Sequence, residues 1–94
     1  MKDNYTRHEE LCEFMNTLYI EKNKKYGDSF TMAIDRYGKV AMILRLYDKF
    51  NRAERLILGF ENGSTDESLT DTLIDLANYS LMIVMYLERD KEEL

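Results

Sequence analysis

The chain contains no proline in its 94 residues, so every position keeps the backbone N–H that a helix interior needs. Large apolar residues recur three and four residues apart, which is the spacing of one face of an α-helix. Stretches such as TLYI and MILRLY fit this spacing better than the alternation of a strand. The sequence therefore predicts an all-α fold, a helical bundle of three long helices and one short helix that forms a single domain over residues 1–94.

Turn residues and capping patterns place the helix boundaries. A capping-box pattern at Thr6 opens the first helix. Gly38 closes the short helix, Gly59 ends the second long one, and the turn FENGS precedes the last. An apolar stripe along the second long helix is formed by Val40, Ile43, Leu44, Tyr47, Phe50 and Ile57. We expect helices at residues 6–25, 29–37, 39–58 and 65–90.

The last helix is apolar on more than one face, and the run from Leu81 to Leu87 contains only apolar side chains and one tyrosine. A bundle of this size cannot enclose such a segment from all sides. A chain this short also buries only about 60 to 65% of the surface that its unfolded state exposes. We therefore expect a homo-oligomer in which a second copy completes the bundle.

Composition narrows the classes of partner. The net charge is -5, with a pI near 4.8, which argues against polymeric nucleic acid and anionic membrane surfaces as partners. The longest apolar run is too short to span a bilayer. Cys12 is the only cysteine, so no internal disulfide can form, and we expect it to pack in the interior of a cytoplasmic protein. His8, the only histidine, is expected at the surface.

Asp71, Asp75 and Asn78 lie four and three residues apart in an otherwise mostly apolar stretch. This spacing stacks two carboxylates and an amide on one helical face. Like charges one turn apart repel, and a partly buried carboxylate without a partner costs several kcal/mol. The strip therefore needs a cation, which is either a metal ion or a basic side chain.

The second long helix offers such side chains on one of its faces. That face carries Arg45, Asp48, Lys49 and Arg52. Because the turn between the two helices is short, we expect them to be antiparallel neighbours whose charged faces meet. Arginine and lysine bind phosphate oxygens, and the aspartates could orient them, hold Mg²⁺ or contact a ribose or base. An ion-pair network that merely fixes the packing of the helices explains the same residues.

The loop KKYGDSF is a second candidate. Lys25 precedes a glycine turn and a helix N-terminus, where an anion can bind, and Tyr26 could stack on a base. Asp28 or Ser29 is placed to cap the short helix. An ordinary turn with solvated lysines and a packed aromatic residue is the alternative.

Three blocks, KKYGDSF, RLYDKFNR and DESLTDTLIDLANYSLM, occur in this order between His8 and Leu87. In these blocks the chain resembles the nucleotide-modification-associated domain of bacteria and their phages. The resemblance implies a connection with nucleotides. If the chain is phage-encoded, it implies a place in the host cytoplasm, where it would sequester a host defence messenger or serve modified-base metabolism.

More distantly, the helix order resembles the all-α nucleoside triphosphate pyrophosphohydrolases of the MazG and dCTPase type. Those enzymes hold Mg²⁺ with a Glu-Glu-x-x-Glu motif on one helix and Glu-x-x-Asp on the next. In this chain the first motif falls on Asp48, Lys49 and Arg52, and the second on Asp75 and Asn78. Two of the five acidic positions therefore keep an acid, and cations that can grip phosphate directly replace two others.

The leading hypothesis is a homo-oligomer that binds a phosphorylated nucleotide, or a signal of the cyclic-nucleotide type, in a charged site between helices. On this hypothesis it needs no cofactor and does not hydrolyse its ligand efficiently. One alternative is a Mg²⁺-dependent pyrophosphohydrolase of the MazG and dCTPase type that holds its metal with Asp48, Asp71 and Asp75. Another is a structural ion-pair network without a ligand. The nucleotide-binding candidates are Lys25, Tyr26, Asp28, Arg45, Asp48, Lys49, Arg52, Asp71, Asp75 and Asn78.

Overall fold

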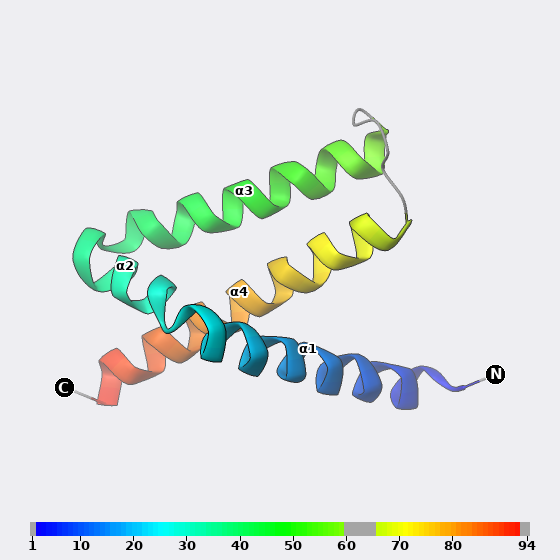
Figure 1. Ribbon diagram of the computed structural model, residues 1–94, viewed down its shortest axis with the longest axis horizontal. Coiled ribbons are helices and arrows are strands. Elements are labelled where there is room, and N and C mark those ends of the chain that lie inside the picture. Colours follow the sequence, from blue (N-terminus) through cyan, green and yellow to red (C-terminus); the bar gives the residue numbers. More distant parts are fainter. Residues whose placement is uncertain (1, 60–65, 93–94) are drawn as a thin grey trace.

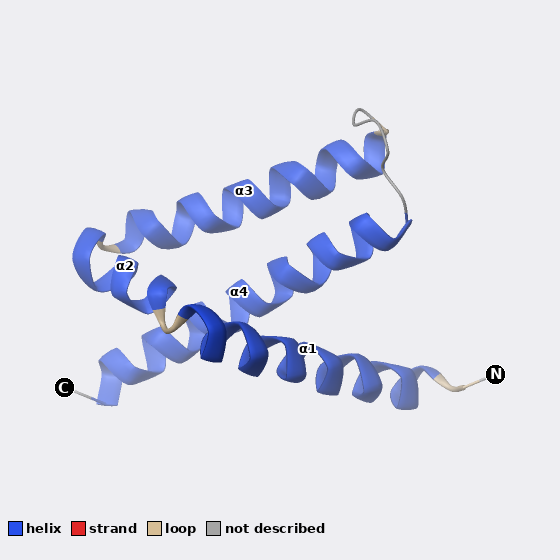
Figure 2. Ribbon diagram, in the orientation of Figure 1, coloured by secondary structure: helices blue, strands red, loops and turns tan. Residues whose placement is uncertain are grey.

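A computed structural model of the chain describes residues 2–59 and 66–92. Within these ranges the chain forms three long helices and one short helix, without a strand (Figure 2). The predicted all-α fold is thereby confirmed. The helices are α1 (Asn4–Tyr26), α2 (Ser29–Tyr37), α3 (Lys39–Leu58) and α4 (Asp66–Glu92). The turn FENGS lies outside the described residues.

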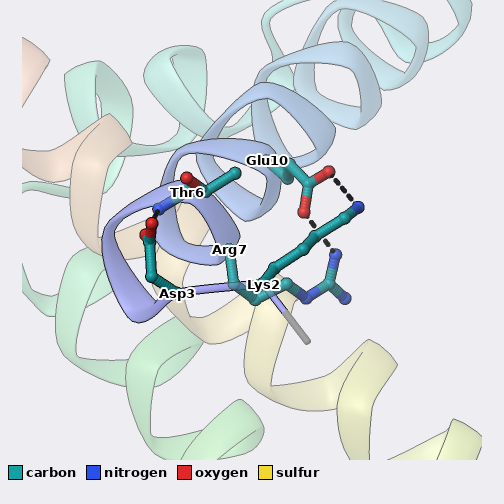
Figure 3. Close-up of polar contacts among 5 residues, drawn as sticks. All are labelled: Lys2, Asp3, Thr6, Arg7 and Glu10. Atoms are coloured by element: carbon teal, nitrogen blue, oxygen red, sulfur yellow. Dashed lines mark hydrogen bonds and ion pairs between the residues drawn. The ribbon is translucent and has the colours of Figure 1, made fainter.

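Helix α1 begins earlier than the sequence predicted (Figure 3). Asp3 is the N-cap, and its Oδ1 accepts a hydrogen bond of 2.8 Å from the backbone N–H of Thr6. The same bond lowers the pKa of Asp3 from its usual value. The capping box predicted at Thr6 is therefore wrong, because the aspartate three residues earlier already satisfies that N–H. One turn further on, Glu10 pairs with Lys2 and Arg7.

The boundaries around α3 agree with the prediction because two glycines fix them. Gly38 has φ 78° and Gly59 has φ 76°, and both values favour glycine over residues with a Cβ. Gly59 ends α3 in the left-handed conformation, with its N–H donating to the carbonyl oxygens of Arg55 and Leu56. Helix α3 therefore runs without interruption from one glycine to the other.

Helices α3 and α4 lie side by side and run antiparallel, whereas α2 joins α1 to α3 at one end and α1 crosses α4 (Figure 1). The core lies where α2 meets α3 and α4. There Phe30, Ile34 and Met42 are buried against Tyr79 and Met82. Helix α4 thus contributes to the contacts of all three other helices, and its side chains can meet residues from each of them.

The apolar stripe of α3 faces away from α4. Phe50, near its middle, is 57% exposed. The opposite face of the helix buries Met42, Ala53 and Leu56, and it also carries Lys49, which contacts Asp75 of α4. The face of α3 that is turned to the other helices therefore carries these buried apolar residues together with Lys49, and the larger apolar stripe is left at the surface.

No residue of α1 is buried. Cys12, which we expected in the interior, is exposed, and its Sγ lies 3.6 Å from Nδ1 of His8. The expectation was wrong because the polar contacts of α1 with α4 involve Met15 and Lys22, which both lie beyond Cys12 along the helix. His8 is exposed, as predicted. Among the described residues, no helix is both long and apolar enough to span a membrane.

Candidate functional site

A cavity of about 350 Å³ lies between α1 and α4, beside the start of α2 and the middle of α3. Most of its wall area is apolar and includes four aromatic rings. These belong to Tyr19, Tyr26, Phe30 and Tyr79. The rest of the lining includes lysine, aspartate and asparagine side chains, so a flat apolar group and an anion can both find a partner there.

Asp75 of α4 binds two lysines from two other helices. Its Oδ1 accepts from Nζ of Lys22 in α1 at 2.7 Å, and its Oδ2 accepts from Nζ of Lys49 in α3 at 3.4 Å. The Asp75 and Lys49 side chains are only 23% and 26% exposed. The hydrogen bond to Asp75 raises the pKa of Lys22 above its ordinary value, although partial desolvation opposes the shift. Two cations therefore share one carboxylate in this cavity.

The other two members of the predicted polar strip have different surroundings. The Nδ2 group of Asn78 donates a 3.1 Å hydrogen bond to the backbone carbonyl of Met15, which ties α4 to α1. Asp71 is exposed and does not line the cavity. Its charge nevertheless contributes to the raised pKa of Lys22, after the larger contributions of Asp75 and Tyr79.

Tyr79 forms one wall of the cavity and is held from two sides. Its ring meets Phe30 edge-on, with centroids 5.1 Å apart and an angle of 84° between the planes. The guanidinium of Arg45 lies 5.5 Å from the centroid of the same ring, and Nζ of Lys49 lies 5.8 Å from it. Arg45 thus contacts Tyr79 without lining the cavity itself, and it adds positive charge close to the ring.

Of the remaining predicted residues, some lie at the cavity and others lie outside it. Tyr26 lines the cavity, and Nζ of Lys25 lies 5.2 Å from its ring centroid on α1. Asp28 stands outside, where its side chain makes no capping bond and instead accepts from the hydroxyl of Thr31 at 2.9 Å. Asp48 and Arg52 are exposed and do not line the cavity.

The three-aspartate metal site is not assembled in the described part of the chain. No group of three or more histidine, cysteine, aspartate or glutamate side chains gathers there as a metal ion would require. Asp75 alone, of Asp48, Asp71 and Asp75, lines the cavity. Its two oxygens are already bonded to lysines.

Sequence reasoning singled out Tyr26, and Phe30 of the same loop is the other aromatic residue that could stack on a base, but it missed Lys22, Tyr19 and Tyr79, although the spacing contained a signal. Tyr19 and Lys22 lie seven and four residues before Tyr26, which places all three on one face of α1. Tyr79 lies four residues after Asp75 on α4 in the same way. Extending the helical faces of Tyr26 and Asp75 would have marked these residues as candidates, but not their contacts with other helices.

A second charged cluster joins α2 to the C-terminal part of α4. Asp35 of α2 accepts hydrogen bonds at its Oδ1 from the hydroxyl of Tyr86 at 2.7 Å and from Arg89 at 2.8 Å. The guanidinium of Arg89 lies 4.4 Å from the ring centroid of Tyr86. These bonds, led by that of Tyr86, lower the pKa of Asp35.

Comparison with known proteins gives one match. The model of a family described as nucleotide modification associated domain 1 matches residues 22–87. Every residue that lines the cavity, except Tyr19, lies within this span. No curated protein and no solved structure matches the chain.

Proposed function

This chain belongs to the nucleotide modification associated domain 1 family, and on that premise we propose that its cavity binds a phosphorylated nucleotide or a nucleotide-derived signal without hydrolysing it efficiently. The observation that carries the proposal is the pair of lysine ammonium groups on Asp75 beside four aromatic rings. A nucleotide presents the two matching features, a flat base and an anionic phosphate.

The charge balance of the cavity supports binding of an anion. Two lysines against one aspartate leave one positive charge unmatched among the ionisable groups of the lining. A phosphate that enters beside Asp75 can accept a further hydrogen bond from each lysine, since an ammonium group has three donors. Lysine stems are flexible, so the groups can turn toward the ligand without moving the helices.

The size and walls of the cavity support binding of a base. Its volume of about 350 Å³ lies near the lower end of the range of about 300 to 1,000 Å³ for small-molecule sites. Tyr26 and Tyr79 come from different helices, and both line the cavity, where a base could contact them. The supporting Phe30 and Arg45 contacts fix the Tyr79 ring in advance, which lowers the entropic cost of binding.

The lysines also explain why this proposal does not include rapid hydrolysis of the ligand. They neutralise phosphate charge themselves, so binding requires no metal ion. Hydrolysis requires in addition an activated water, and Asp75, the acid in the lining, is engaged by both lysines. A protein that holds its ligand unchanged suits sequestration of a nucleotide signal, or its delivery to a modifying enzyme.

The test is to incubate the purified protein with a panel of nucleotides and cyclic nucleotides, with Mg²⁺ and with EDTA, and to analyse by mass spectrometry what denaturation releases. We expect an unchanged nucleotide, retained equally well in EDTA. Substituting either lysine, Lys22→Met or Lys49→Met, should weaken binding at least tenfold. Lys39→Met, which removes an exposed lysine of α3 outside the cavity, is the matched control.

Three other outcomes would contradict the proposal. Conversion of the nucleotide that stops in EDTA would indicate the pyrophosphohydrolase instead. Retention of nothing from the panel, with lysine variants that melt at lower temperature, would indicate a purely structural network. Equal affinity in the Lys49→Met and Lys39→Met variants would show that the ligand binds elsewhere.

A further inference from the structure

The single chain exposes more surface than a compact protein of its size. Its accessible area is 7549 Å², whereas a compact monomer of 11.2 kDa is expected to expose about 5,700 Å². Its radius of gyration is 15.1 Å, against about 12.4 Å for a compact domain of this length. The excess, about 1,850 Å², is more than the about 800 Å² that each partner buries in a standard interface and lies in the range of obligate homodimers.

Much of the exposed apolar surface belongs to the outward face of α3. Seven side chains on that face are each between 57% and 64% exposed. Together they present on the order of 800 Å², which is what each partner contributes to a standard protein interface. An apolar patch on a monomer seldom exceeds about 600 Å². The seven residues are Val40, Ile43, Leu44, Tyr47, Phe50, Ile57 and Leu58.

We propose that this α3 face packs antiparallel against the α3 face of a second copy of the chain, in a two-fold dimer. In a two-fold dimer the same face serves both copies, so that every contact between the copies occurs twice. Aliphatic residues stand at both ends, from Val40 at the start to Leu58 at the finish, with Tyr47 and Phe50 about the midpoint. Reversal places Tyr47 opposite Phe50 of the second copy.

The surroundings of the face also favour a second copy over a membrane. Asn51 and Glu54 lie among its apolar residues, Asp48 borders it, and all three are exposed. With a net charge of -5, an acidic border repels anionic lipid. Lys49 points from the opposite side of α3 into the cavity, so the dimer leaves the nucleotide site open and does not depend on it.

The test is the mass of the purified protein by sedimentation equilibrium. We expect the wild type at two chains or an even multiple, and the double variant Tyr47→Glu with Phe50→Glu at half that mass or less. Because both residues are exposed in the single chain, the variant should keep its helical circular dichroism. Met32→Glu, which charges an equally exposed apolar residue of α2, should keep the wild-type mass. A wild type of one chain, or an assembly that the double variant does not reduce, would overturn the proposal.

Cross-linking keeps the proposal testable if the double variant fails to fold. In a Cys12→Ser background, Asn51→Cys places one thiol near the middle of the α3 face, and Glu88→Cys places one on α4 away from it. A short bismaleimide should join two chains through position 51 and not through position 88. Absence of cross-linking at position 51, or equal cross-linking at both positions, would show that α3 is not the interface.

Discussion

The carboxylates of Asp75 and Asp35 use the same chemistry in two different ways. Asp75 receives two lysines from two other helices, one on each oxygen, and lies beside a cavity. Asp35 receives both of its partners on one oxygen, a tyrosine hydroxyl and an arginine that come from a single helix. The Asp75 partners can turn to a ligand, whereas the Asp35 partners are fixed on each other.

The type of cation explains much of this difference. Arg89 stacks on the Tyr86 ring at 4.4 Å while it bonds to Asp35, so its planar group is held in two directions. Lys22 and Lys49 are point charges on flexible stems, and each retains donors for another acceptor. On the proposed function, we therefore expect ligand binding at the Asp75 cluster and a structural role for the Asp35 cluster.

The largest expected effect is on nucleotide binding. Replacing both lysines, Lys22→Met with Lys49→Met, should reduce affinity about a hundredfold, which corresponds to about 2.7 kcal/mol. Arg89→Met removes a cation from the Asp35 cluster and should leave affinity within twofold of wild type. Isothermal titration calorimetry with the nucleotide that the panel identifies measures both. A similar loss in the two variants would erase the distinction between the clusters.

The second effect is on stability. Asp75→Ala leaves two half-enclosed lysines without their carboxylate, and we expect a loss of about 1 to 3 kcal/mol in the free energy of unfolding. Asp35→Ala should cost less, because the Asp35 side chain is 49% exposed and water can replace it. Urea unfolding followed by circular dichroism compares them. A larger loss of stability in Asp35→Ala than in Asp75→Ala would mean that the exposed Asp35 cluster contributes more to the stability of the fold.

These clusters also show how far the sequence could predict the molecule. The four helices follow from apolar spacing and from the glycines between them, because both act locally. The contact of Lys49 with Asp75 could be predicted because the two residues lie on neighbouring antiparallel helices. Lys22 could not be predicted with equal ease, since its approach to Asp75 depends on the angle at which α1 crosses α4. Long-range packing sets that angle, and no local pattern encodes it.

The outward apolar stripe of α3 follows from a competition between its two faces. Apolar area alone would turn Tyr47 and Phe50 inward, whereas they are 62% and 57% exposed. The face turned to the other helices instead buries Met42, Ala53 and Leu56 and carries Lys49, which meets Asp75. A second copy packed on the stripe would bury this face as well. The sequence of one chain does not distinguish burial within the chain from burial between two chains.

A third effect should appear in the dependence of stability on pH. The folded pKa of Asp35 is lowered from 3.8, so its contribution is present above the unfolded value and is lost as pH falls through the folded one. The folded pKa of Lys22 is raised from 10.5, so its contribution is complete below that value and is lost as pH rises through the raised one. Melting curves of Asp35→Asn and Lys22→Met should therefore converge with wild type at opposite ends of the pH scale. Convergence of both at the same end would contradict the assigned partners.

The smallest effect comes from exchanging the two kinds of cation. Lys49→Arg keeps the charge near Asp75, and because the cavity has room beside it, nucleotide affinity should stay within about threefold, or about 0.6 kcal/mol. Arg89→Lys also keeps the charge but loses the planar stack on Tyr86, which should cost about 0.5 to 1 kcal/mol of stability without altering affinity. Thermal melting and calorimetry on the same two proteins separate these results. If Arg89→Lys is neutral while Lys49→Arg abolishes binding, then the lysine site demands exact geometry and the arginine site tolerates any cation, which is the opposite of the roles assigned here.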